Sequence, residues 1–319
     1  MCRFSMQRAA RSAGVVLQHS CRTGRCGACK CRVIQGQTQR LGSDESLSVA
    51  EKVQGWILTC TFAAADSELQ LDTEDVSILA NYPARTTPCR IDGLELLAPD
   101  VMRVTLRFPP NGAPLYLAGQ YADVIGPGGI RRSYSIANAP DASGKVELHV
   151  RRVPGGALSR YWFEQARAGD LLRLDGPKGS FYLRDVAGLD LVFMATGTGY
   201  APVQAMLAAL TARELSEQPR SITLYWGGRT PADLYRRPSA PAGAAFRFVP
   251  VLSRADNSWS GARGYVQHAL LADRQTFDSS AVYACGSMTM IADASTVLEG
   301  AGLPNRRFFS DAFVSSSAH

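Results

Sequence analysis

The sequence predicts three consecutive domains of different class: an α+β domain, an all-β barrel and an α/β domain. Three observations predict this order. Four cysteines lie near the N-terminus, short alternating segments recur between Gly/Pro turns in the middle, and apolar strands alternate with helices toward the C-terminus. The chain has 319 residues, a length that fits two or three domains of about 100–200 residues each.

The composition is that of an ordinary globular protein, with 46% hydrophobic and 19% charged residues. The formal net charge is +6, but the 34 basic residues are scattered along the chain, which argues against nucleic-acid binding. No apolar run approaches the roughly 20 residues of a membrane helix, and the N-terminus lacks the apolar segment of a signal peptide. We therefore expect a cytoplasmic protein that binds neither nucleic acid nor a membrane.

The first element with recognisable chemistry is a cysteine motif, C-x4-C-x2-C followed by a single cysteine after 30 intervening residues. Its members are Cys21, Cys26, Cys29 and Cys60. This is the plant-type spacing of a 2Fe-2S cluster. Gly24 and Gly27 permit the tight turns by which three thiolates of one loop face a common centre. A structural zinc site also uses four cysteines, but zinc favours two C-x2–4-C pairs, and here the fourth cysteine stands alone.

This segment resembles a plant-type ferredoxin domain, and its run from Cys26 to Gly36 resembles the reductases of aromatic-ring dioxygenases. The resemblance implies a β-grasp domain over residues 1–78 with a 2Fe-2S cluster. Ferredoxin domains of this kind begin with a β-hairpin, whereas residues 6–14 already have the pattern of the helix that follows it, with Gly14 as the C-cap. We therefore expect a β-grasp domain without its first hairpin, which would expose a sheet edge.

Residues 79–88 contain two prolines and no periodicity, so we predict a linker there. From residue 89 to residue 184, short alternating segments recur between Gly/Pro turns, which predicts a small antiparallel barrel. These segments are 102–108, 121–125, 145–150 and 170–174.

Three motifs lie in the barrel segment. Arg132-Ser133-Tyr134-Ser135 follows a Gly119-Gln120-Tyr121 turn, and Gly155-Gly156 opens a helix predicted over 158–166. A glycine-rich helix start offers free N–H groups and a positive dipole end to a pyrophosphate. In this order the motifs resemble the flavin domain of the ferredoxin-NADP reductase superfamily.

That resemblance implies FAD as cofactor. Arg132 would bind a flavin phosphate, Tyr134 would stack on the isoalloxazine, and Ser135 would hydrogen-bond near flavin N5. The full set of residues implied to bind FAD is Arg132, Tyr134, Ser135, His149, Val150, Arg151, Gly155, Gly156 and Ser159.

From residue 185 to residue 319 the pattern changes to apolar strands alternating with helices. The buried-strand run 189–195 leads into Thr196-Gly197-Thr198-Gly199 and a helix over 203–213. A strand, a glycine-rich turn and a helix together form a phosphate cradle. The glycines do not follow G-x-G-x-x-G; they resemble the G-T-G-x-x-P turn that faces the nicotinamide dinucleotide in the same superfamily.

Three further strands, 221–226, 246–252 and 281–284, end in residues that match the superfamily. The resemblance implies that these residues bind the dinucleotide: Arg229, Ser253, Arg254, Arg263, Cys285 and Gly286. The Cys285 thiol would lie beside nicotinamide C4, although Met288 stands where the superfamily commonly has proline.

The choice between the two dinucleotides stays open. The spacing of Ser253, Arg254 and Arg263 matches the grip of plant reductases on the 2′-phosphate of NADPH, where arginine pairs well with phosphate. The segment 259–264 instead resembles oxygenase reductases that use NADH, and we favour NADH slightly.

The segment 308–313 resembles the superfamily's closing segment over the flavin. Asp311 would join Ser135 and Cys285 around the hydride path, so these three residues are the predicted catalytic group.

The order of ferredoxin, flavin and nicotinamide segments predicts an enzyme that passes electrons from NADH or NADPH through FAD and a 2Fe-2S cluster to a protein partner. From residue 132 onward the chain resembles the CDP-6-deoxy-3,4-glucoseen reductases, which supply a dehydrase in deoxysugar synthesis. One alternative is the reductase component of an aromatic-ring-hydroxylating oxygenase. Others are a non-catalytic flavin-binding redox-sensing subunit and a zinc-stabilised flavoprotein reductase.

Overall fold

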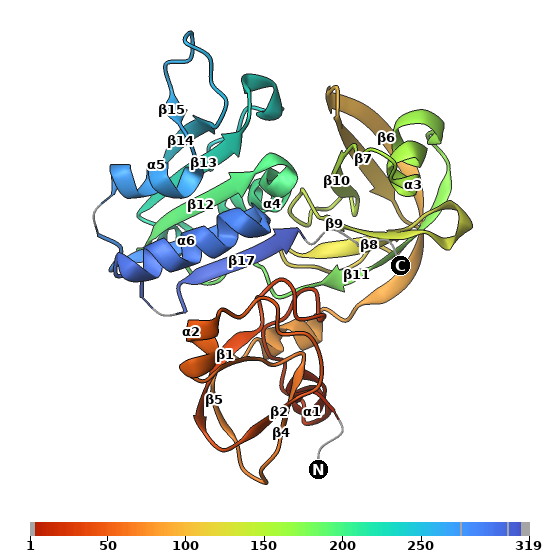
Figure 1. The fold of residues 1–319 in the computed structure, drawn as a ribbon. Coiled ribbons are helices and arrows are strands. Elements are labelled where there is room, and N and C mark those ends of the chain that lie inside the picture. Colours follow the sequence, from red (N-terminus) through yellow and green to blue (C-terminus); the bar gives the residue numbers. More distant parts are fainter. Residues whose placement is uncertain (1–3, 275, 305, 314–319) are drawn as a thin grey trace. The chain divides into compact units, whose positions relative to one another are not determined.

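The computed structural model describes residues 4–274, 276–304 and 306–313 (Figure 1). The chain divides into two compact units. The first unit comprises Met1–Pro83 and Asp311–His319, and the second comprises Ala84–Ser310.

Five short strands of the first unit form two small antiparallel sheets. The larger sheet has the order β3-β1-β5, which are Trp56–Leu58, Lys30–Gln35 and Gln70–Asp72. The smaller sheet pairs β2 (Thr38–Arg40) with β4 (Phe62–Ala64). Met6, Cys31 and Ile57 form a small buried core.

The helix that we expect over residues 6–14 is present in the first unit, together with a second short helix that the sequence analysis did not predict. Helix α1 spans Met6–Ser12, and Gly14 follows it in the left-handed conformation that ends helices. Helix α2 (Val49–Val53) begins with a capping box between Ser48 and Glu51. A 3-10 helix, η1, covers Ser77–Asn81. The expected α+β class is confirmed.

The second unit contains a six-stranded antiparallel barrel sheet in the order β10-β7-β6-β11-β8-β9. The strands in that order are Val146–Arg151, Val101–Arg107, Arg85–Ala98, Leu171–Lys178, Tyr121–Ile125 and Arg131–Ser135. A bridge between Ile136 and Leu148 joins the two edges of the sheet. Alternate side chains such as Val104, Leu106 and Leu148 are fully buried in the barrel core.

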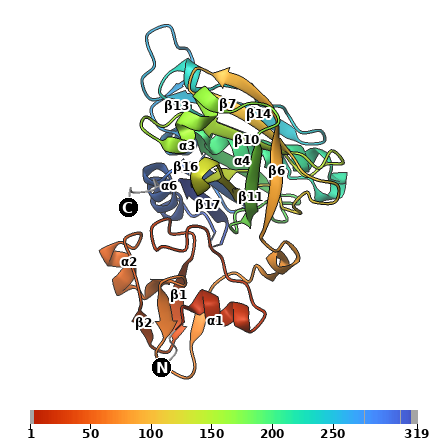
Figure 2. The ribbon, with the colours of Figure 1, turned by 90° about the vertical axis from the view of Figure 1, so that its right-hand side faces the viewer.

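Strand β6 begins at Arg85, inside the segment 79–88 that we predicted as a linker (Figure 2). Pro88 pairs with Arg173 of β11, while β7 pairs with β6 only from Arg90 onward. The proline is tolerated because β6 has a neighbour on one side only at that point.

The barrel's helix begins as α3 (Ala157–Arg160) and continues as a π-helical turn, η3 (Tyr161–Gln165), which buries Trp162. Four 3-10 turns complete the second unit: η2 (Pro127–Gly129), η4 (Gly197–Gly199), η5 (Leu215–Glu217) and η6 (Pro231–Asp233).

The rest of the second unit is built on a six-stranded sheet in the order β15-β14-β13-β12-β16-β17, of which the end of β17, from Asp311 onward, is counted with the first unit. These strands are Ala262–Arg263, Ala245–Leu252, Ser221–Gly228, Asp190–Thr196, Ser280–Ser287 and Phe308–Phe313. The first five pair in parallel. Three helices accompany them: α4 (Tyr200–Thr211), α5 (Val266–Asp273) and α6 (Met288–Gly300). Helices α5 and α6 pack together (Figure 1).

The predicted α/β class is therefore confirmed, as is the all-β barrel before it. Strand β12 is central because the chain proceeds from it to β13 and β14 on one side and later to β16 on the other. In open parallel sheets, ligands bind at the carboxyl ends of strands where the order reverses in this way. The fold thus points to the carboxyl ends of β12 and β16.

Within the described ranges, no helix combines the length and the apolar character needed to cross a membrane.

Candidate functional site

The cysteine loop of the first unit is shaped by a glycine. Gly24 has φ +81°, and a Cβ atom there would lie 2.1 Å from the backbone oxygen of Ser43. The backbone N–H and the hydroxyl of Ser46 both donate to Gly24 O, at 3.3 and 3.0 Å. The loop therefore packs so closely against residues 43–46 that only glycine fits at position 24.

The four predicted ligand cysteines form two pairs. Cys29 Sγ and Cys60 Sγ lie 3.3 Å apart. Cys21 Sγ accepts the backbone N–H groups of Thr23 and Cys26, both at 3.4 Å. Cys26 and Cys29 are buried, whereas Cys21 and Cys60 are partly exposed.

One thiol in each pair is acidic. A hydrogen bond from the Cys26 thiol lowers the pKa of Cys21 to about 4, and the Cys29 thiol lowers the pKa of Cys60 in the same way. The same two hydrogen bonds raise the pKa of Cys26 and of Cys29. In each pair, deprotonation of one thiol to the thiolate, the form that binds metal, is therefore favoured.

This arrangement fits a two-iron cluster. A tetrahedral zinc site takes its protein ligands around one metal ion. A 2Fe-2S cluster instead takes two protein ligands at each iron, which matches the two pairs. Thr61 is buried directly after Cys60, and a hydrogen bond from its side chain also helps to lower the pKa of the Cys60 thiol, so a hydroxyl donor lies beside this cluster ligand.

Cys31 lies outside this group, as expected from its spacing. It is on β1, is 1% exposed, and packs in the core with Met6 and Ile57. Burial raises the pKa of its thiol to about 12, so it stays protonated and inert.

The barrel strand β9 carries the predicted flavin residues. Tyr134 accepts a hydrogen bond from Trp162 Nε1 at 3.0 Å, and the two rings meet edge to face at 6.3 Å. Arg132 is exposed and Ser135 is buried at the end of the strand. The turn before β8 is held by Gln120, which accepts from Leu117 N and donates to Gly179 O.

The glycine-rich loop after β10 is shaped by its own side chains. Gly156 is the N-cap of α3, and Ser159 accepts the backbone N–H of Val153 at 2.7 Å. Gly155 has open space around its Cα. Val150 is fully buried in the barrel core, which leaves only its backbone for a ligand.

Arg151, another predicted FAD residue, connects two parts of the second unit. Its Nε donates to Asp100 at 2.8 Å and its Nη2 donates to Asp233 at 2.5 Å. A Cβ at Gly197, in the turn after β12, would lie 2.8 Å from Arg151 Nη1. Asp233 also accepts the backbone N–H of Arg229. Arg151 therefore connects the barrel to the turn after β12 and to the turn after β13.

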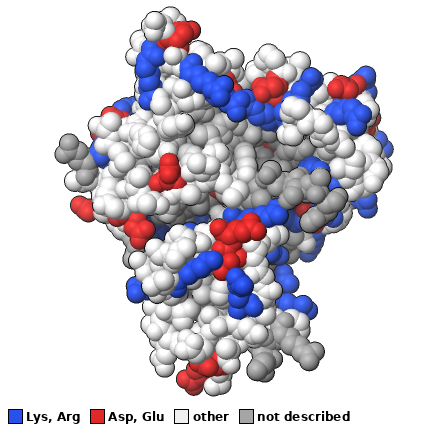
Figure 3. All heavy atoms as spheres, viewed as in Figure 1, with Lys and Arg blue, Asp and Glu red and all other residues white. Residues whose placement is uncertain are grey.

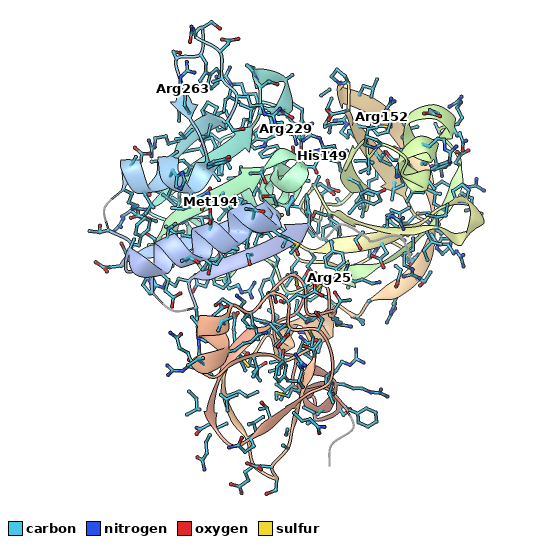
Figure 4. The ribbon with its side chains drawn as sticks, in the orientation of Figure 1. Arg25, His149, Arg152, Met194, Arg229 and Arg263 are labelled. Carbon is cyan, nitrogen blue, oxygen red and sulfur yellow. The ribbon has the colours of Figure 1, made fainter. Side chains whose placement is uncertain are left out.

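His149 belongs to a buried polar network that the sequence analysis missed (Figure 4). Its Nδ1 lies 3.0 Å from Tyr235 OH, and its Nε2 lies 2.9 Å from Glu147 Oε1. Gln204 of α4 donates to the same carboxylate at 3.0 Å. Burial lowers the pKa of His149, so the neutral ring is favoured. Only the alternation of Glu147 and His149 on one face of β10 could have indicated part of this network.

An aromatic stack supports the turn after β12. The rings of Tyr200 and Trp226 lie 4.1 Å apart at an angle of 14°, and Tyr235 meets Trp226 edge to face. Trp226 Nε1 donates to Gly197 O at 3.1 Å. The stack fixes the start of the turn that contains Gly197, Thr198 and Gly199.

The carboxyl ends of β12 and β16 are in close backbone contact. Ser287 N donates to Thr196 Oγ1 at 3.0 Å. Gly286 has φ +134°, and a Cβ there would lie 2.1 Å from Thr196 Oγ1, while a Cβ at Gly199 would lie 2.2 Å from Cys285 O. The Cys285 side chain is fully buried. Gly199 after β12 and Gly286 at the end of β16 are therefore both needed for this contact.

The predicted dinucleotide residues after β13 and β14 fall into two groups. Ser253 N donates to Gly228 O at 3.0 Å and Arg254 N donates to Arg229 O at 2.9 Å, so the two exposed arginines are neighbours. Arg263 instead donates to the backbone oxygens of the loop before it, at Ala255, Asp256 and Trp259 (Figure 4). Its guanidinium holds that loop, whereas phosphate binding by Arg229 and Arg254 stays a prediction.

Asp311 is 5% exposed and accepts a hydrogen bond from Ser20 at 2.8 Å within the first unit. Burial raises the pKa of its carboxyl to about 6. Ser135 and Cys285 belong to the second unit, so the grouping of these three residues around one hydride path stays a prediction.

On the side drawn in Figure 3, Lys and Arg side chains are interspersed with Asp and Glu side chains.

Three family models match the chain in succession. They are a 2Fe-2S iron-sulfur cluster binding domain at residues 2–65, an oxidoreductase FAD-binding domain at residues 88–182 and an oxidoreductase NAD-binding domain at residues 193–296. The cofactors of the chain are thus a 2Fe-2S cluster, FAD and NAD. The exact domain boundaries that we expect remain predictions.

Known proteins of similar length match over nearly the whole chain. The CDP-6-deoxy-L-threo-D-glycero-4-hexulose-3-dehydrase reductase of Yersinia pestis is 39% identical over 97% of this chain and 92% of its own length. The terephthalate 1,2-dioxygenase reductase component 1 of Comamonas sp. is 32% identical over 97% of this chain and 91% of its own. The crystal structure of the Amycolatopsis cytochrome P450 reductase GcoB has a TM-score of 0.73 and 30% identity, covering 98% of this chain and 95% of that one.

These relatives are named as reductases, and they match this chain along the same succession of three domains. The chain is an oxidoreductase, and it belongs to the ferredoxin-fused, FAD- and NAD-binding reductases of the ferredoxin-reductase superfamily.

Proposed function

We propose that this protein is the reductase that supplies electrons to a CDP-6-deoxyhexulose dehydrase in deoxysugar synthesis. The observation that carries the proposal is the 39% identity to the Yersinia reductase of that name along nearly the whole of both chains. The dehydrase is the partner in this proposal. A cytoplasmic location fits a protein whose cluster ligands are free thiols.

When bound, the nicotinamide dinucleotide, FAD and the 2Fe-2S cluster would supply the hydride and single-electron chemistry, and the protein would position them. We assign the cluster to the two thiol pairs. We assign FAD to β9, β10 and the loop before α3, and the nicotinamide dinucleotide to the carboxyl ends of β12, β13, β14 and β16.

Within this assignment Ser135, Cys285 and Asp311 are the proposed catalytic residues. The Ser135 hydroxyl would hold the flavin by a hydrogen bond from the end of β9. The Cys285 thiol would exclude water beside the nicotinamide, and because it is fully buried, a neighbouring group must move before the ring can reach it. Asp311, whose pKa is raised to about 6, would exchange a proton near neutral pH.

The test of the proposed electron path uses a pair of cysteine variants. We expect Cys60→Ser to lose iron and the NADH-dependent reduction of cytochrome c, while it keeps NADH-dependent ferricyanide reduction by the flavin. Cys31→Ser is the matched control because its thiol is in the core and should leave iron content and both activities intact. A Cys60→Ser protein that reduces cytochrome c at the wild-type rate would refute the path.

The second candidate is the reductase component of an aromatic-ring oxygenase. The 32% identity to the terephthalate dioxygenase reductase, over a similar share of both chains, supports it. Stopped-flow transfer from the NADH-reduced protein to a purified dehydrase and to a purified oxygenase component separates the two. The acceptor that is reduced faster by at least an order of magnitude is the physiological class. A protein that binds flavin but shows no NADH turnover with any acceptor would instead be a redox-sensing subunit.

A further inference from the structure

The first unit has an unusual distribution of charge along its sequence. Residues 1–43 contain seven Arg and one Lys but no Asp or Glu. Residues 44–83 contain eight Asp and Glu and a single Lys. The helix α1 and the cysteine loop therefore both come from a stretch that carries positive charge only.

Part of this positive charge is neutralised inside the unit. Lys30 pairs with Glu51 at 2.6 Å, Arg40 pairs with Asp44 at 3.3 Å, and Arg25 lies 4.0 Å from Glu45. These pairs join the basic stretch to the acidic stretch and leave little net charge around them.

Arg8 and Arg11 on α1 are different. Both are exposed, and no carboxylate of the described residues forms an ion pair with either of them. Arg8 is in contact with the ring of Phe4, which orders its guanidinium without neutralising it.

These two arginines line a pocket of about 200 Å³ in the first unit. Arg22 of the cysteine loop and Cys60, a proposed cluster ligand, line the same pocket. None of the described residues that line it is Asp or Glu. The pocket thus combines three guanidinium groups with a ligand of the cluster.

We propose that this pocket, lined by Arg8, Arg11, Arg22 and Cys60, is the docking surface for a carboxylate-rich surface of the protein that accepts electrons from the cluster. The inference rests on the proposed function, because it assumes that electrons leave through the cluster. Charge complementarity decides the kind of partner: the guanidinium groups of Arg8 and Arg11, which form no ion pair with a described carboxylate, attract carboxylates and repel basic surfaces. Docking there brings the acceptor next to Cys60, which shortens the distance an electron must cross.

The test uses one haem protein in two charge states. Native cytochrome c is basic, and succinylation converts its lysines to carboxylates, which makes it acidic without changing the haem. We expect the NADH-loaded holoenzyme to reduce the succinylated form faster at low ionic strength, and this advantage to fall as salt screens the charges.

The double variant Arg8→Gln, Arg11→Gln should lose the advantage, with the rate on succinylated cytochrome c reduced about fivefold or more at low salt. The rate on native cytochrome c should stay equal or rise. Arg8→Lys, Arg11→Lys keeps both charges and should restore the wild-type ratio. The matched control is Arg32→Gln, an exposed arginine on β1 that does not line the pocket.

The outcomes separate this inference from the proposed function. If the glutamine variant keeps the wild-type ratio of the two rates, the docking surface is wrong even though the cluster still delivers electrons. If Cys60→Ser reduces both cytochromes at the wild-type rate, electrons do not leave through the cluster, and the proposed path and the docking surface both fail.

Discussion

At the residue scale, three arginines that the sequence groups together have different contacts. Arg263 donates to three backbone oxygens of its own loop, whereas Arg229 and Arg254 are exposed neighbours at the ends of β13 and β14. Spacing along the chain cannot distinguish these roles, because it does not reveal which acceptors surround a guanidinium.

The prediction from this difference concerns coenzyme choice. Arg254→Ala should lower kcat/KM for NADPH by about tenfold or more, since a hydrogen bond to a charged phosphate is lost, while kcat/KM for NADH changes little. Arg263→Ala should weaken both coenzymes alike by loosening the loop. Steady-state kinetics with the two coenzymes check this. Equal losses for both coenzymes in Arg254→Ala would show that this arginine does not contact the 2′-phosphate.

The residues that could be predicted are those whose signal is local. The four cysteines follow a fixed spacing, and the structure brings them together as two pairs. The buried polar network around His149 could not be predicted. Its members Glu147, His149, Gln204 and Tyr235 lie up to 88 positions apart along the chain, and they meet only after the barrel and the parallel sheet pack.

At the scale of elements, the contact between β12 and β16 depends on glycine. We expect Gly286→Ala to reduce NADH-dependent flavin reduction roughly 100-fold, because the added Cβ would collide with Thr196 and displace the strand end. FAD should stay bound, since the barrel is untouched. Rapid-mixing absorbance of the flavin measures the effect.

Gly300→Ala is the matched control for that variant. Gly300 ends α6, has no atom within 4 Å of the position of an added Cβ, and needs no left-handed backbone. It should reduce the flavin at the wild-type rate. Wild-type flavin reduction in Gly286→Ala as well would contradict the assignment of the nicotinamide site to these strand ends.

The start of β12 is held by a buried carboxylate. Asp190 accepts two hydrogen bonds from Arg220, at 2.9 and 2.5 Å, and one from Ser221 at 2.7 Å, and it also pairs with Arg274. The Arg220 hydrogen bonds are the main reason that the pKa of Asp190 falls from its usual 3.8 to about 2.

Asp190→Asn should lower the free energy of unfolding by about 2 kcal/mol at neutral pH, because the charge-assisted hydrogen bonds that lower the pKa of the carboxylate are lost. A carboxylate with a depressed pKa stabilises the fold above its unfolded pKa of 3.8 and loses that effect as the pH falls toward 2. Urea unfolding of both proteins should therefore give a constant difference above pH 4 and a shrinking one below it. A difference that grows on acidification would refute this assignment.

Element boundaries were less predictable than element types. The two prolines of 79–88 suggested a linker, yet β6 begins at Arg85. The sequence does not reveal that Pro88 lies where the strand has a neighbour on one side only, since that depends on where β7 ends.

At the scale of the whole molecule, the order of domains was predictable because each has its own local signature: a cysteine spacing, a flavin motif after a barrel-like pattern, and a glycine-rich turn between a strand and a helix. The three family models match in the same order. The partner was less predictable, because dehydrase and oxygenase reductases share this electron path and differ in what accepts the electrons.

In our assignment, one chain carries electrons from the nicotinamide coenzyme to the iron–sulfur cluster. An anaerobic titration of the purified protein with NADH, followed by visible and electron paramagnetic resonance spectra, tests it most directly. We expect flavin bands and broad iron–sulfur absorbance that are both bleached, with the signal of a reduced 2Fe-2S cluster appearing. A flavin that is bleached while the iron–sulfur absorbance is absent or unchanged would contradict it.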